Sequence, residues 1–112
     1  MWNIKMMPKS LTIASAAGIL MSVTVALAQS PGDRGHDLVK DLCAPCHAVD
    51  KTGDSPNAGA PPFRTLGNSF DLDRFARRLQ RGLEPGHPDM PAFKFNEEDA
   101  HAVAAYLRSI QQ

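Results

Sequence analysis

The chain has 112 residues, with twelve basic and twelve acidic side chains and a formal net charge of zero at pH 7. This length leaves room for one small domain, and the balanced charge excludes the basic excess typical of nucleic-acid-binding domains. The two cysteines allow at most one disulfide, which excludes the disulfide-rich class of small exported proteins.

The first 28 residues have a composition of their own. Residues 1–10 carry two lysines and no acidic side chain, while residues 11–28 (LTIASAAGILMSVTVALA) carry no charge and close on Ala-Leu-Ala. A positive start, an apolar run and small residues before the cleavage site are typical of a secretory signal peptide. An uncleaved membrane anchor is the alternative, but this run is short for a span and contains serines and threonines. We expect cleavage after Ala28 and export to the periplasm.

The domain expected after cleavage, residues 29–112, keeps ten basic and twelve acidic side chains, a net charge of −2 with neutral histidines. We expect it to be a monomer with no stable membrane insertion. A domain of this size buries a smaller share of its surface than a large one, and often needs a metal or a cofactor to complete its core.

The first predicted helix begins after Ser30 and runs into Cys43. Ser30 can cap the helix, Pro31 suits its first position, and Asp33 lies in its first turn, where each residue type is favoured. Gly35 lies inside this helix, where a glycine costs about 1 kcal/mol relative to alanine. A close crossing with another helix would explain its presence.

A loop and a second helix are predicted next. Residues 50–62 (DKTGDSPNAGAPP) are rich in the residues that break regular structure. The following helix is predicted over residues 71–81, with Gly82 ending it. Its candidate caps are Asn68, Ser69 and Asp71. One apolar stripe follows this helix and consists of Leu72, Phe75, Ala76, Leu79 and Leu83.

A second loop over residues 82–95 leads to a last helix that begins at Asn96. Three acidic residues at 97–99 stand near its positive end, and Arg108 stands near its negative end, as the helix dipole favours. The β-branched residues of the mature chain are too few and too scattered for a sheet. The chain therefore predicts an all-α fold with three main helices.

Four arginines recur along the predicted middle helix at a spacing that places them on one face. They are Arg74, Arg77, Arg78 and Arg81. This face is either a docking patch for an acidic partner or the solvated side of an amphipathic helix. The sequence alone leaves both interpretations open.

Both cysteines and one histidine lie within the pentapeptide 43-CAPCH-47. A thioredoxin-like dithiol needs a strand leading into the motif, and a zinc site needs a second pair of ligands; neither is evident in this sequence. The remaining interpretation is covalent attachment of c-type haem, for which C-x-x-C-H is the signature. In that chemistry the two thiols add to the vinyl groups, and the imidazole is held beneath the iron. We therefore predict one covalently attached haem c.

Met90 is the candidate for the sixth ligand of the iron, and it is the only methionine of residues 29–112. Pro88 and Pro91 flank it, and prolines stiffen a loop by fixing φ. His87 is the alternative sixth ligand. We assign no role to His36 and His101, which are expected to be solvated.

Taken together, these segments resemble the small soluble class I c-type cytochromes over essentially the whole expected mature chain, from Gly35 to about Ile110. The pieces that carry the resemblance are 35-GHDL-38, 43-CAPCH-47, 60-APPF-63, 87-HPDMPAF-93 and 106-YL-107. The resemblance implies a small helical cytochrome fold packed around the haem. It also implies that Gly35 and Tyr106 meet where the first and last helices cross.

The resemblance implies roles for individual residues as well. Cys43 and Cys46 would form the thioether bonds, and His47 and Met90 would be the axial ligands of the iron. The carbonyl of Pro61 would accept a hydrogen bond from the ring of His47, with Pro62 possible if the alignment slips by one residue. Many relatives carry a tryptophan near the haem propionates, and residues 29–112 have none. Arg64 and, less strongly, Asn57 are the candidates for that role.

His/Met ligation favours reduced iron and leaves no open position for oxygen or peroxide. The expected function is therefore periplasmic one-electron transfer and not catalysis. The redox partners would be a donor, such as a quinol-oxidising complex or a dehydrogenase, and an acceptor such as a terminal oxidase. A cytochrome subunit held permanently by one dehydrogenase is an alternative, and a haem sensor or enzyme with a labile methionine is a weaker one.

Overall fold

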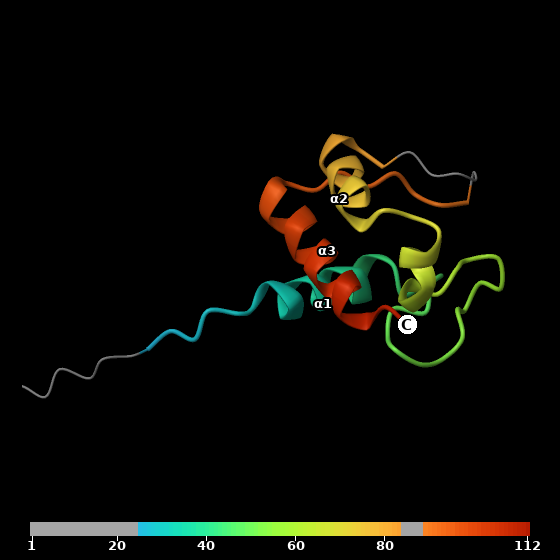
Figure 1. Cartoon of the computed structure of the whole chain (residues 1–112), viewed down its shortest axis with the longest axis horizontal. Coiled ribbons are helices and arrows are strands. Elements are labelled where there is room, and N and C mark those ends of the chain that lie inside the picture. Colours follow the sequence, from blue (N-terminus) through green and yellow to red (C-terminus); the bar gives the residue numbers. More distant parts are fainter. Residues whose placement is uncertain (1–24, 84–88) are drawn as a thin grey trace, which may run out of the picture.

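The computed structural model describes residues 25–83 and 89–112 of the chain. Within these residues three α-helices and one short 3-10 helix follow one another in the order α1 (Pro31–Leu42), η1 (Phe63–Asn68), α2 (Leu72–Arg81) and α3 (Glu97–Ile110). The described part contains no strand beyond a single bridge between Leu83 and Phe93. The predicted all-α fold is confirmed, and Figure 1 shows α3 crossing α1 while α2 packs at the other end of α3.

The first turn of α1 follows from its sequence. The hydroxyl of Ser30 accepts a hydrogen bond from the backbone N–H of Asp33 at 3.2 Å, and Pro31 occupies the first helical position. This cap satisfies one of the N–H groups that a helix start leaves without a partner. The helix ends at Leu42, so that Cys43 is its last, half-in residue. The predicted helix and its cap are confirmed.

Gly35 lies where α1 crosses α3. A Cβ atom at this position would come 2.8 Å from Cβ of Tyr106 and 2.6 Å from the carbonyl carbon of Ala102, closer still to the carbonyl oxygen of that residue. Only a residue without a side chain allows the two backbones to approach this closely. The predicted close crossing is therefore confirmed, and it explains why a glycine is retained inside a helix.

The tyrosine at this crossing also ties α3 to the chain after the CAPCH motif. The hydroxyl of Tyr106 donates a hydrogen bond to the carbonyl of Val49 at 2.7 Å and lies 3.2 Å from a carboxylate oxygen of Asp50. The same carboxylate oxygen lies 3.1 Å from the ring of His36, which packs against the ring of Tyr106. His36 remains partly solvated, with a side chain that is 36% exposed, but the fold also gives it partners from two other segments of the chain.

Helices α2 and α3 begin with side-chain caps of the predicted kind. Asp71 accepts a hydrogen bond from the N–H of Arg74 at 2.8 Å, and Asn96 accepts one from the N–H of Asp99 at 2.8 Å. Gly82 ends α2 with a φ of 100°, a backbone conformation that favours glycine. The apolar stripe of α2 faces inward, because Ala76, Leu79 and Leu83 are buried.

The 3-10 helix η1 is an element that the sequence pattern did not predict. Phe63 begins it, and its N–H donates to the carbonyl of Ala48 at 2.9 Å. The amide of Gln111 at the end of α3 donates to the carbonyl of Phe63 at 2.9 Å and accepts from the N–H of Gly67 at 2.6 Å. These contacts are made with residues far away in the sequence, so no local sequence pattern predicts them.

The segment after α2 returns to pack against the same helix. The N–H of Leu83 donates to the carbonyl of Phe93 at 2.8 Å, and the N–H of Phe95 donates to the carbonyl of Leu79 at 2.9 Å. These two bonds close the loop that carries Met90. The alternative ligand His87 lies outside the described residues.

The described chain begins with an extended segment that makes little contact with the domain. Val25 is 75% exposed and Leu27 is 93% exposed, both ahead of α1. Figure 1 shows this segment leading away from the helices. Over residues 25–83 and 89–112, no helix combines the length and the apolar character that crossing a membrane requires.

Candidate functional site

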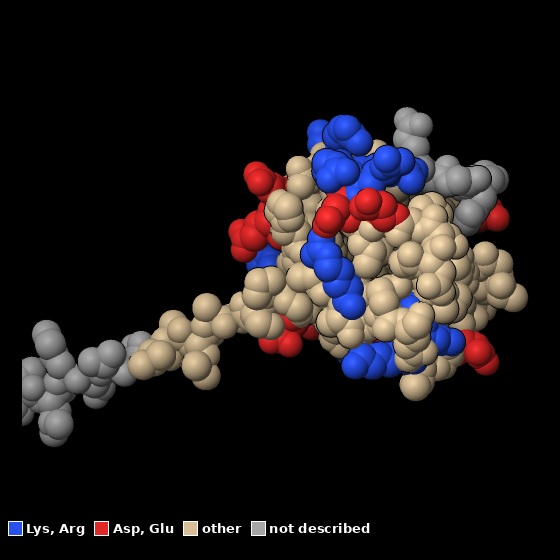
Figure 2. Space-filling model, viewed as in Figure 1, with Lys and Arg blue, Asp and Glu red and all other residues tan. Residues whose placement is uncertain are grey.

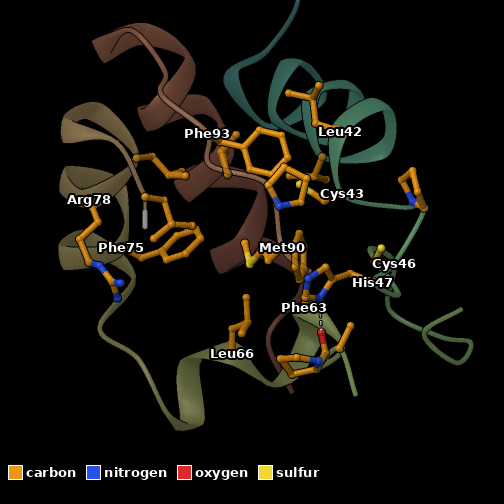
Figure 3. A pocket seen from close by; sticks show the side chains of 18 of the residues that line it. Leu42, Cys43, Cys46, His47, Phe63, Leu66, Phe75, Arg78, Met90 and Phe93 are labelled. Atoms are coloured by element: carbon orange, nitrogen blue, oxygen red, sulfur yellow. Dashed lines mark hydrogen bonds between the residues drawn. The ribbon is translucent and has the colours of Figure 1, made fainter. Parts of the chain in front are cut away.

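A single cavity brings together the residues that the sequence singled out. It has a volume of about 430 Å³, and Cys43, Cys46, His47 and Met90 all line it. The remainder of its wall is mostly apolar and comes from α1, η1, α2, α3 and the segment after Met90. Figure 3 shows the sulfur of Met90 and the ring of His47 near the middle of this space.

The backbone of the CAPCH motif is a tight turn at the end of α1. The N–H of Cys43 donates to the carbonyl of Val39 at 2.8 Å, which continues the pattern of the helix. The carbonyl of Cys43 then accepts from the N–H of Cys46 at 3.1 Å and from that of His47 at 2.9 Å. In a helical turn, residues three and four apart share one side of the chain. Cys46 and His47 therefore lie on the same side as Cys43, and all three line the cavity.

Both cysteines are free thiols, and the environment of Cys43 argues against this thiol as the nucleophile of a disulfide exchange. Burial in apolar surroundings raises the pKa of the Cys43 thiol to about 11. A dithiol that exchanges disulfides needs a lowered pKa in at least one thiol, because the thiolate is the nucleophile. An apolar wall instead suits a sulfur that becomes a neutral thioether.

The ring of His47 is buried and held in one orientation. His47 is only 9% exposed, and its Nδ1 lies 2.8 Å from the carbonyl oxygen of Pro61. Because a carbonyl can only accept a hydrogen bond, Nδ1 must carry the proton, which leaves the lone pair of Nε2 for a metal. The bond is made by Pro61 and not by Pro62. The ring of Phe63 packs against the imidazole, with 4.8 Å between the ring centres.

The loop that carries Pro61 is itself tied to the CAPCH motif. The N–H of Asn57 donates to the carbonyl of Cys46 at 3.1 Å, and the hydroxyl of Ser55 accepts from the N–H of Ala48 at 2.9 Å. The carbonyl of Asn57 then accepts from the N–H of Ala60 at 3.0 Å. The sequence predicted a loop here and the bond between His47 and Pro61, but not the bonds by which the loop is tied to the CAPCH motif.

Met90 lies partly buried against the core and faces the same cavity. Its neighbours in the wall include Phe93 from its own segment and Phe75 from α2, as Figure 3 shows. A soft thioether and a neutral imidazole that open onto one cavity are a ligand pair suited to iron in an electron-transfer site.

The residues present fit a haem. Two thiols at one side of the cavity, an imidazole with its free nitrogen available and a thioether are the donor set that a covalently attached, His/Met-ligated haem requires. The apolar wall matches the porphyrin, which would complete a core that 84 residues leave small. Residues 29–112 and the cavity are therefore consistent in size and in chemistry with one haem.

Arg64 and Arg78, which are relevant to the propionates of such a cofactor, lie in different positions relative to the cavity. Arg64, the sequence-based candidate, donates from Nη1 to the carbonyl of Gly53 at 2.7 Å and is not part of the cavity wall. Asn57 does line the cavity, although its side-chain oxygen accepts from the N–H of Gly59 at 2.9 Å. Arg78, which sequence reasoning placed on a surface stripe, lines the cavity.

The chain is similar to known proteins over most of its length. Residues 32–111 match the family model described as Cytochrome c. The chain is 32% identical over 99 residues to cytochrome c-552 of Bradyrhizobium diazoefficiens, an alignment that covers 84% of this chain and 93% of that protein. No solved structure matches the chain significantly.

Proposed function

The chain belongs to the cytochrome c family, as a small class I c-type cytochrome that carries covalently attached haem c, and on this premise we propose that it is a periplasmic one-electron carrier. In this proposal Cys43 and Cys46 attach the haem, and His47 and Met90 ligate its iron. The observation that carries it is the shared cavity onto which all four side chains open.

The chain's own residues supply attachment and orientation. When bound, the haem supplies an iron that takes up and releases one electron. Each thiol adds across one vinyl group, sulfur to one carbon and hydrogen to the other, so that nothing is lost. The bond between His47 and the carbonyl of Pro61 keeps the proton on Nδ1 and makes Nε2 a stronger ligand.

The loop of Met90 and the apolar wall would tune the iron. A thioether ligand favours reduced iron, and a dry apolar wall disfavours the additional charge of oxidised iron. The hydrogen bonds from Leu83 to Phe93 and from Phe95 to Leu79 hold both ends of the loop. Anchoring of Phe93 and Phe95 close to Met90 would limit the movement of this ligand between oxidation states, which suits fast electron exchange.

Export and cleavage after Ala28 belong to the same proposal. The extended, exposed chain ahead of α1 supports it, because Val25 and Leu27 contribute nothing to the core. The expected mature domain, residues 29–112, contains every described helix. Fractionation of cells that express the full chain should place the haem protein in the periplasm with Gln29 as its first residue.

Attachment is tested by replacing both Cys43 and Cys46 with alanine. The variant should lose its haem when denatured in acid, whereas the wild type should keep it. Pro45→Ala is the matched control, because it changes the motif and leaves its thiols and imidazole in place. Haem that survives denaturation in the double variant would refute thioether attachment at these residues.

Ligation by Met90 is tested with carbon monoxide. The reduced wild type should not bind it, because both axial positions are filled, while reduced Met90→Ala should bind it readily. Lys94→Ala, an exposed change in the same segment, should behave as the wild type does. Ready binding by the wild type would instead favour a sensor or enzyme with a labile methionine.

The partners are tested by purification. A carrier should purify alone and exchange electrons with separate donor and acceptor proteins, here a quinol-oxidising complex or dehydrogenase and a terminal oxidase. Co-purification in a fixed ratio with one dehydrogenase would instead identify a permanent subunit.

A further inference from the structure

Arg78 differs from the three other arginines of α2. Arg74, Arg77 and Arg81 are exposed, whereas Arg78 is half-buried and lines the large cavity. Figure 2 shows basic side chains gathered over this helix. Of the four arginines only Arg78 lines the large cavity, although it also borders a smaller pocket together with Arg74. The stripe that the sequence presented as one surface is therefore two features, an exposed set and a single inward arginine.

Arg78 is half-buried and borders a largely apolar cavity, where an anion would be a favourable partner for its guanidinium. Removing a charged group from water is costly unless it is paired and hydrogen-bonded. Among residues 25–83 and 89–112, two arginines form ion pairs: Arg34 with Asp99 and Arg108 with Asp73. None of the described carboxylates pairs with Arg78. Asp89 lines the same cavity, but it is exposed and forms no ion pair with Arg78.

The haem brings carboxylates of its own into this cavity. Its two propionates stand on the side of the porphyrin away from the vinyl groups. Attachment to Cys43 and Cys46 fixes the vinyl side at the end of α1, so that the propionate side must face the opposite wall. Figure 3 shows Arg78, which comes from α2, across the cavity from both cysteines.

We infer that Arg78 binds a haem propionate. A guanidinium offers parallel N–H donors that match a carboxylate, and this pair would give the charged side of the haem a fixed partner within the cavity wall. The inference rests on the proposed attachment at Cys43 and Cys46. It assigns to Arg78 the role for which the sequence had suggested Arg64, whose guanidinium is engaged with the carbonyl of Gly53 instead.

The test compares Arg78→Leu with Arg77→Leu in the haem-loaded protein. Both changes remove one positive charge from α2, but Arg77 is exposed and does not line the cavity. Arg78→Leu should shift the propionate bending band in the resonance Raman spectrum and lower the midpoint potential more than Arg77→Leu does, because an unpaired carboxylate near the iron stabilises its oxidised form. Arg78→Lys, which keeps the charge, should lie nearer the wild type in potential.

Other results would overturn the inference. Equal potentials and an unchanged propionate band in Arg78→Leu and Arg77→Leu would show that Arg78 has no contact with the haem. A lowered potential with an unchanged band would show that Arg78 acts only through its field. If Arg78→Leu yields no haem protein, Arg78→Gln and Arg77→Gln are compared in the same way. Failure of the attachment itself would appear separately, as loss of haem from the denatured wild type.

Discussion

Replacement of Gly35 by alanine tests the close contact between helices α1 and α3. The added Cβ would meet the carbonyl carbon of Ala102 at 2.6 Å and Cβ of Tyr106 at 2.8 Å, whereas ordinary contact begins at 3.4 Å. Helices α1 and α3 must therefore separate by at least about 0.8 Å at this point. A gap of that size forfeits about a quarter to a half of the dispersion attraction of each contact affected.

The expected cost is the balance of two effects. Overpacking of a well-packed interface costs about 1–3 kcal/mol, and a clash with backbone atoms belongs at the upper end because backbone cannot rotate away. Alanine gains back about 1 kcal/mol of helix propensity. We therefore expect Gly35→Ala to lower the free energy of unfolding by about 2 kcal/mol, a large share of the stability of a small domain.

Chemical denaturation of the haem-loaded protein, followed by circular dichroism, measures this loss. Gly32→Ala is the matched control, since it lies in the same helix and its added Cβ would have only the hydroxyl oxygen of Ser30 nearby, at 3.9 Å. The control should be neutral or slightly stabilising. If the two variants unfold at the same denaturant concentration, a side chain at position 35 is tolerated and the close crossing of α1 and α3 does not require glycine there.

Three further changes test a buried tyrosine and two helix caps. Burial, assisted by the charge of Asp50, raises the pKa of Tyr106 to about 12, so the phenol stabilises the fold fully below its ordinary pKa of about 10 and progressively less as pH rises towards 12. Alkaline unfolding curves should therefore fall more steeply for the wild type than for Tyr106→Phe, and parallel curves would refute this. Asn96→Ala removes the cap of α3 and should cost about 1 kcal/mol in denaturant unfolding, while Asn96→Ser should cost much less; equal losses would show that the cap does not matter. The hydrogen bond from the N–H of Arg74 holds the pKa of Asp71 below its ordinary value, so stability is lost as pH falls through the lowered pKa; acid unfolding should be less steep in Asp71→Asn, and identical slopes would contradict this.

Much of the fold could be predicted because its signals are local. A helix start needs a capping side chain and a few neighbours, so Ser30, Asp71 and Asn96 could each be recognised from the sequence. Helical periodicity then indicates which side of α2 is buried, because residues three and four apart share a face. The family match confirms the cofactor that the CAPCH pentapeptide predicted.

Other features needed the folded chain, because they depend on residues far apart in sequence. The 3-10 helix from Phe63 to Asn68 is held by Ala48 and by Gln111, and no local pattern encodes such partners. His36 was expected to be solvated, and only the fold shows that its partly exposed ring also packs against Tyr106. Arg64 was a candidate partner of the propionates, and only the fold shows that its guanidinium donates to the carbonyl of Gly53.

By itself, the sequence predicted the three α-helices and the covalent haem chemistry, since the spacing of two thiols and an imidazole in 43-CAPCH-47 is specific to haem attachment. Only the tertiary structure decided between Pro61 and Pro62 as the partner of His47, and only it divided Arg78 from the exposed arginines of α2. Helical spacing identifies residues that share a face, but the neighbouring elements determine which part of that face borders the cavity and which part meets water.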